Sequence, residues 1–115
     1  MNFILINMDD MGWRDLSCSG STFYETPNID RLSRQSMFFT EAYSACPVCS
    51  PSRASMMSGK YPARMGTTDW FDHTGYHPMR GPLLDAPYVN HLPAEEVSLA
   101  QALREGGYAT WHVGK

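Results

Sequence analysis

The chain has 115 residues, of which 43% are hydrophobic and 12% aromatic, and its formal net charge at pH 7 is −3. This length is typical of one globular domain or part of one, and the apolar content excludes a disordered chain. The acidity is mild and there is no run of Lys or Arg, so we expect no nucleic-acid partner.

No apolar run approaches the ~20 residues that cross a bilayer, so no membrane span is expected. The N-terminus lacks the basic start and cleavage site of a secretion signal, which leaves the compartment open. The three cysteines, Cys18, Cys46 and Cys49, are too few and of the wrong parity for a disulfide framework. At least one thiol therefore needs another role, and Cys18 is expected to pack as a small hydrophobic residue.

The first predicted element is a strand over residues 3–6, a short continuous apolar run typical of a strand buried on both faces of a parallel sheet. It ends at the acidic pair Asp9 and Asp10. Pro27 then opens a segment with apolar residues three apart behind a capping candidate, which predicts a helix of two or three turns. Residues 37–40 are predicted to form a second strand.

Ser50 and Pro51 predict the start of the next helix, because Ser50 offers a capping hydroxyl and Pro is tolerated at the first helical position. Gly59 supplies the stop signal. Residues 61–93 are dense in Pro, Gly, His and aromatic residues without a sustained period, which predicts a long ordered loop. Such loops usually carry function or wrap a site.

The last elements are a helix over residues 97–104, closed by Gly106 and Gly107, and a strand over residues 108–113. Strands alternating with helices predict an α/β fold with a mostly parallel sheet flanked by helices. Ligands of open sheets bind beyond the carboxyl ends of strands, where we expect Asp9–Asp10, Cys49 and Lys115 to converge.

Taken alone, each of these groups also has an ordinary explanation. Adjacent acids such as Asp9 and Asp10 are more often a turn or a helix cap, although Ca²⁺ and Mg²⁺ need anionic oxygen ligands of this kind. Cys46 and Cys49 form a C-x-x-C pair, consistent with a redox dithiol, or with half of a zinc site that no second pair completes. By its spacing alone, Lys115 is a solvated lysine.

Arg53 lies four residues after Cys49, near the N-terminus of the predicted helix. The helix dipole disfavours a cation there and favours an anion, and a guanidinium group adds a bidentate fork for a tetrahedral oxyanion. An anion-binding role therefore competes with the alternative of a surface arginine.

Several motifs match one known family in order along the chain. The segment CSPSRASMMSGKYP at residues 49–62 resembles the signature of the type I sulfatases, which belong to the alkaline-phosphatase-like superfamily. Residues 7–13 (NMDDMGW) resemble the metal-binding opening of that family, and residues 26–32 (TPNIDRL) resemble the segment that follows. Residues 106–110 (GGYAT) and 113–115 (VGK) are similar to the strand that delivers an active-site lysine.

The resemblance implies that Asp9 and Asp10 bind a divalent cation, usually Ca²⁺ with Mg²⁺ as the alternative. It also implies that a formylglycine-generating enzyme, reading Cys49, Pro51 and Arg53, oxidises Cys49 to formylglycine. The hydrate of residue 49 would offer one oxygen to the metal and to sulfur, and its second hydroxyl would later collapse to the aldehyde and release sulfate. Arg53 would hold the hydrate, and Lys115 would neutralise sulfate oxygens.

The expected activity is hydrolysis of a sulfate ester on a small molecule or glycan to alcohol and inorganic sulfate. Periplasmic, secreted or lysosomal location would be usual for the family. The alternatives are a phosphoesterase or phosphonate hydrolase of the same superfamily, or a non-enzymatic role in which Cys46 and Cys49 form a redox pair.

The resemblance implies that residues 1–115 are the N-terminal portion of a sulfatase catalytic domain, with a truncated sheet. It also implies that the family pattern continues beyond Lys115 into further metal and sulfate ligands. The 115-residue chain alone is therefore expected to be inactive and, through exposed strand edges, to self-associate. Among the histidines, His112 is expected to pack on the last strand. His73, His77 and His91 lie in the loop, where a solvated or locally capped state outweighs substrate contact.

Overall fold

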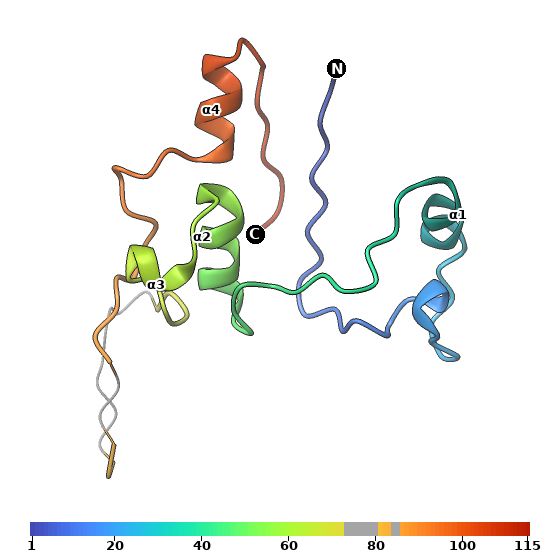
Figure 1. The fold of residues 1–115 in the computed structure, drawn as a ribbon, viewed down its shortest axis with the longest axis horizontal. Coiled ribbons are helices and arrows are strands. Elements are labelled where there is room, and N and C mark those ends of the chain that lie inside the picture. The colour runs from blue at the N-terminus through green and yellow to red at the C-terminus, as the bar shows by residue number, and fades with distance from the viewer. Residues whose placement is uncertain (73–80, 84–85) are drawn as a thin grey trace. The chain divides into compact units, whose positions relative to one another are not determined.

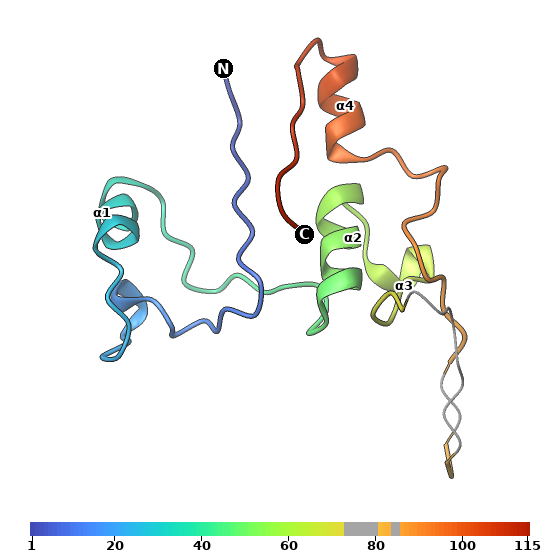
Figure 2. The ribbon, with the colours of Figure 1, turned by 180° about the vertical axis from the view of Figure 1, so that it is seen from behind.

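The computed structural model describes residues 1–72, 81–83 and 86–115 (Figures 1 and 2). The chain divides into two units, residues 1–43 and 44–115, which are taken separately below. The elements in chain order are the 3-10 helix η1 (Ser17–Ser19) and the α-helices α1 (Pro27–Gln35), α2 (Cys49–Ser58), α3 (Pro62–Met65) and α4 (Leu99–Glu105).

In the first unit, η1 is joined to α1 through the carboxylate of Asp30. Its Oδ1 atom accepts hydrogen bonds from the Cys18 backbone N–H at 3.0 Å and from the Thr26 hydroxyl at 2.8 Å. Ser17 completes the cluster, since its backbone N–H donates to Thr26 Oγ1 at 3.0 Å. Thr26 precedes Pro27 as predicted, but its hydroxyl bonds Asp30 and Ser17 and does not cap the helix. None of the side chains of this unit is fully buried.

The second unit is built around α2, which contacts both α3 and α4. Among the residues that the structure describes in this unit, the buried ones come from α2, from α3 and from the turn that follows α3: Pro51, Ala54, Pro62, Met65 and Thr67. Burial of this small, mostly apolar cluster gives α2 a tertiary anchor, which a ten-residue helix needs to be stable in water.

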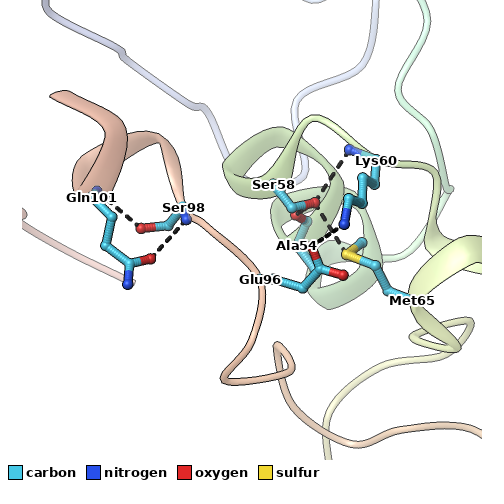
Figure 3. Close-up of polar contacts among 7 residues, drawn as sticks. All are labelled: Ala54, Ser58, Lys60, Met65, Glu96, Ser98 and Gln101. Carbon is cyan, nitrogen blue, oxygen red and sulfur yellow. Dashed lines mark hydrogen bonds and ion pairs between the residues drawn. The ribbon is translucent and has the colours of Figure 1, made fainter. Parts of the chain in front are cut away.

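The C-terminal end of α2 is closed as the sequence predicts. Gly59 adopts a left-handed conformation with φ of 69°, and its backbone N–H donates to the Ser55 carbonyl. The Ser58 hydroxyl lies 2.8 Å from the Ala54 carbonyl oxygen and 3.1 Å from Sδ of Met65 (Figure 3). Ser58 therefore links the last turn of α2 to α3.

Helix α4 begins with a capping box. The Ser98 hydroxyl accepts from the Gln101 backbone N–H, and the Gln101 side chain accepts from the Ser98 backbone N–H (Figure 3). Just before this cap, Glu96 forms an ion pair of 2.5 Å with Lys60, which follows α2 (Figure 3). The helix starts two residues later than predicted and ends at Gly106, as predicted.

The three predicted strands are not formed among the described residues. Residues 3–6, 37–40 and 108–113 lie in segments with neither helix nor strand, and most of their apolar side chains are exposed, including Ile4 at 86% and Val113 at 95%. A strand exists only through hydrogen bonds to a neighbouring strand, and no such ladder joins these segments in the part that the structure describes. The predicted sheet is therefore not seen here.

The predicted loop over residues 61–93 contains the short helix α3, which was not predicted. Pro62 at its first turn and Gly66 at its C-cap, with φ of 71°, are the signals that predict it. Residues 73–80, which include His73 and His77, lie outside the described residues, as do residues 84–85. None of the described helices is long and apolar enough to span a membrane.

Candidate active site

Cys49 is the first residue of α2, where the chain passes from an extended conformation at Val48 into the helix. It is half-buried and not disulfide-bonded, and Cys46 is likewise a free cysteine. The predicted start at Pro51 is two residues late. The hydroxyl of Ser50 does not cap the helix, and no side chain caps its N-terminus.

Arg53 lies one helical turn after Cys49, so both residues project from the same face of α2. Its Nη1 atom donates to the backbone carbonyl of Lys115 at 3.0 Å, across a separation of 62 residues. This hydrogen bond joins the segment after α4 to the first half of α2. The second unit thus brings together the helix that carries Cys49 and the backbone that carries Lys115.

Ser50 has a role that sequence reasoning did not assign. Its Oγ atom accepts the backbone N–H of Phe71 at 2.9 Å, and it lies 3.9 Å from Sγ of Cys49. The loop after α3 is thereby attached to the residue next to the candidate nucleophile. A hydroxyl beside a helix start is normally explained as a cap, so no local signal distinguishes this non-local bond.

Asp9 and Asp10 belong to the first unit, and both are exposed. Asp10 has φ of 55°, a left-handed conformation that is uncommon outside glycine but is adopted more readily by Asp and Asn. A local turn follows, in which the Gly12 backbone N–H donates to Asp15 Oδ2 at 2.6 Å. The two carboxylates therefore stand at a sharp bend of the backbone, where the predicted first strand was expected to end.

The donor chemistry of Asp9 and Asp10 fits a hard divalent cation, but the set is incomplete. Two carboxylates offer at most about four oxygens, whereas Ca²⁺ takes about six to eight. Within the described ranges, no group of three or more His, Cys, Asp or Glu side chains is arranged to hold a metal ion. Any cation bound by this pair needs further ligands.

The two histidines that the structure describes, His91 and His112, add little to the site. His112, predicted to pack, is exposed, because the segment around it joins no sheet among the described residues. His91 is also exposed and follows Asn90, whose side-chain amide donates to the backbone carbonyl of Asp72.

Comparisons with known proteins agree with the motifs. The family model described as Sulfatase matches residues 1–115. The chain is 40% identical to N-acetylgalactosamine-6-sulfatase of Canis lupus familiaris, 38% to that of Homo sapiens and 39% to steryl-sulfatase of Mus musculus. Each match covers 98% of this chain but only 22%, 22% and 18% of the relative, so the chain spans about a fifth of their length. On this evidence the chain belongs to the sulfatase family.

Proposed function

We propose that this chain carries the nucleophile region of an enzyme that hydrolyses sulfate esters to alcohol and inorganic sulfate. The main support is the hydrogen bond between Arg53 and the Lys115 carbonyl, which joins α2 and its Cys49 to the segment that ends in Lys115. A nucleophile precursor and two cations in one folded unit suit a doubly anionic transition state. The family match over the whole chain supports the same reaction class.

In this proposal residue 49 acts after oxidation of its thiol to formylglycine and hydration of the aldehyde. One hydroxyl of residue 49 attacks sulfur, the bond from sulfur to the alcohol oxygen breaks, and the alcohol leaves with a proton. The second hydroxyl then loses its proton as the carbonyl re-forms, and sulfate leaves. This route avoids an attack of water on the sulfate ester.

Arg53 and Lys115 have different tasks. Arg53, on the same helix face as residue 49 and fixed to the Lys115 backbone, would orient the attacking hydroxyl. The Lys115 ammonium would neutralise sulfate oxygens as charge moves toward the leaving alcohol. A bound cation, held by Asp9, Asp10 and further ligands, would favour ionisation of the attacking hydroxyl and polarise a sulfate oxygen.

The substrate is proposed as a sulfated small molecule or glycan. The relatives' names refer to two dissimilar alcohols, an amino sugar in N-acetylgalactosamine-6-sulfatase and a sterol in steryl-sulfatase. Both alcohols carry rings. The shared reaction centre is the sulfate ester, so a first assay should vary the alcohol.

The test uses the full-length protein co-expressed with a formylglycine-generating enzyme. Release of inorganic sulfate from aryl, sugar and sterol sulfates is measured beside release of phosphate from matched phosphate and phosphonate esters. We expect sulfate release that Cys49→Ala abolishes, and mass spectrometry should find an aldehyde at residue 49. Phosphate release without sulfate release would instead favour the phosphoesterase alternative.

The redox alternative has a separate readout. Cys46 and Cys49 are both free cysteines in the described structure. A reversible disulfide between them, with unmodified Cys49 and no esterase activity, would contradict the hydrolase proposal. Assayed by itself, the 115-residue chain is predicted to be inactive, because its described carboxylates cannot complete a metal site.

A further inference from the structure

Two consecutive peptide N–H groups fix the backbone around Trp70 beside the candidate nucleophile. The Phe71 N–H donates to Ser50 Oγ at 2.9 Å, and the Trp70 N–H donates to Asp69 Oδ1 at 2.7 Å. Ser50 is the neighbour of Cys49 in α2. The peptide between Trp70 and Phe71 is thereby held one residue from the position where sulfate chemistry is proposed.

The base of the loop is also closed between its incoming and outgoing parts. The Val89 N–H donates to the Gly66 carbonyl at 2.7 Å, and the Asn90 side chain donates to the Asp72 carbonyl. At Gly66 a side chain would meet Val89 Cγ2 at 3.3 Å, so the two parts approach closely. Residues 66–72 and 88–90 therefore form a braced segment and are not a loose connection.

Trp70 stands out within this braced segment because its large side chain is 57% exposed. A partly exposed indole on a fixed backbone offers a flat apolar face with little conformational entropy left to lose on binding. Single exposed apolar residues are common on protein surfaces. The distinguishing feature here is the backbone anchor to the residue beside Cys49.

We propose that Trp70 is a specificity residue that packs against a ring of the substrate's alcohol portion, and that Ser50 is the positioning residue that holds it there. This inference rests on the proposed sulfatase function. The ligand chemistry is the apolar face of a ring, which sugars, sterols and aryl alcohols share and inorganic sulfate lacks. Trp70 would thus recognise the alcohol, while Arg53 and Lys115 act on the sulfate.

The experiment compares two ligands of the full-length enzyme that differ in the ring. One is an aryl sulfate substrate and the other is inorganic sulfate, the product, measured as a competitive inhibitor. In Trp70→Ala we expect KM for the aryl sulfate to rise roughly 3- to 10-fold, the range of one aromatic contact. The inhibition constant of inorganic sulfate should stay within about two-fold of wild type. Trp70→Phe keeps a flat aromatic face, so its KM for the aryl sulfate should stay close to that of wild type.

Ser50 is tested by a matched pair of variants. Ser50→Ala removes the acceptor of the Phe71 N–H and should raise KM for the aryl sulfate by roughly 2- to 5-fold, whereas Ser50→Thr keeps the hydroxyl and should not. Rates are normalised to the formylglycine content at residue 49, since Ser50 lies in the recognised motif. A sugar sulfate and a sterol sulfate, assayed next, show which ring source depends most on Trp70.

The outcomes separate this inference from the function on which it rests. If wild type releases no sulfate from any ester, the proposed function fails and the inference falls with it. If wild type is active but Trp70→Ala leaves KM for the aryl sulfate unchanged, the inference alone is wrong. The same holds if Trp70→Ala weakens the binding of aryl sulfate and of inorganic sulfate equally. An equal effect would mean that Trp70 supports the whole site and recognises no ring.

Discussion

Each of the two units of the chain is stabilised by a different kind of interaction. In residues 1–43 no side chain is fully buried, and η1 meets α1 through hydrogen bonds to the single carboxylate of Asp30. In residues 44–115, Ala54 of α2 and Met65 of α3, each 5% exposed, belong to a buried cluster. The first unit therefore depends on polar hydrogen bonds around Asp30, Thr26 and Ser17, whereas the second depends on apolar packing.

This difference matters for the proposed chemistry. The metal-binding candidates Asp9 and Asp10 lie in the unit without a core, and Cys49, Arg53 and Lys115 lie in the unit that has one. Positioning a nucleophile demands rigid support, which packing around α2 supplies. The carboxylates would gain their final order from a bound cation.

The largest expected effect concerns the charge of Lys115 in the second unit. Lys115→Met in the full-length enzyme should lower kcat/KM on an aryl sulfate by about 10²- to 10³-fold, the typical result of losing one preorganised charge. Lys60→Met is the matched control, because Lys60 pairs with Glu96 at the other end of α2. Lys60→Met, which removes the Lys60 ammonium, should change kcat/KM less than about three-fold. Equal losses of kcat/KM in both variants would contradict the proposed role of the Lys115 ammonium at the sulfate oxygens.

A substitution in the buried cluster should lower the stability of the second unit and leave that of the first unit unchanged. Met65→Ala removes a buried side chain in contact with Ser58 of α2 and should lower the opening free energy of α2 by about 2 kcal/mol. Native-state hydrogen exchange of the α2 amides measures this. Met56→Ala, at a 39% exposed position of the same helix, should cost less than about 0.5 kcal/mol. Amides of α1 should be unaffected by either change if the units are independent.

Lowering the pH should destabilise the contact between η1 and α1 in the first unit. The hydrogen bond from the Thr26 hydroxyl is the largest influence on the Asp30 carboxyl and holds its pKa below the usual range. Desolvation opposes this shift, and hydrogen bonding from Cys18 and the charge of Arg34 lower the pKa further. A lowered folded-state pKa stabilises the η1–α1 contact above the usual Asp value of about 3.9, and this stability is lost as pH falls through the folded-state pKa.

The amide chemical shift of Cys18, followed by NMR during acid titration, reports this transition directly. Its midpoint should lie below the usual Asp value, and Asp30→Asn should abolish the titration and loosen η1 at neutral pH. A midpoint at or above about 3.9 would contradict the proposed role of the Thr26 hydrogen bond.

The smallest effect is expected from the ion pair between Lys60 and Glu96, whose side chains are 42% and 12% exposed. Glu96→Gln keeps an acceptor but removes the charge, and should reduce the stability of the α2–α4 contact by about 0.5 kcal/mol. The difference from wild type should shrink in about 1 M salt, where exposed charges are screened. A salt-independent loss would show that Glu96 contributes through packing.

The helices were largely predictable because their signals are local. Pro27 marks the start of α1, Gly59 closes α2 and Gly106 ends α4. Strands are not determined by local signals in this way, because a segment such as residues 3–6 becomes a strand only when a neighbouring strand forms hydrogen bonds with it. The sulfatase family implies an α/β sheet, and the described residues do not contain it.

The site was predictable only in part for the same reason. The spacing of Cys49 and Arg53 placed both near the N-terminus of the predicted helix. The bond from Arg53 to the Lys115 carbonyl could not be predicted, because it crosses 62 residues that no motif connects. The bond from Phe71 to Ser50 is equally non-local, and it turned a predicted cap into a loop anchor. The roles of Asp9, Asp10, Cys49, Arg53 and Lys115 stay predictions.

The left-handed backbone at Asp10 has a consequence for anyone who mutates it. Replacing it with alanine would alter two variables together, because alanine lacks the negative charge and also disfavours a φ of 55°. Asparagine tolerates that dihedral angle and is uncharged, so its phenotype isolates the loss of the anion. A scan that relies on alanine alone would overstate what the carboxylate contributes.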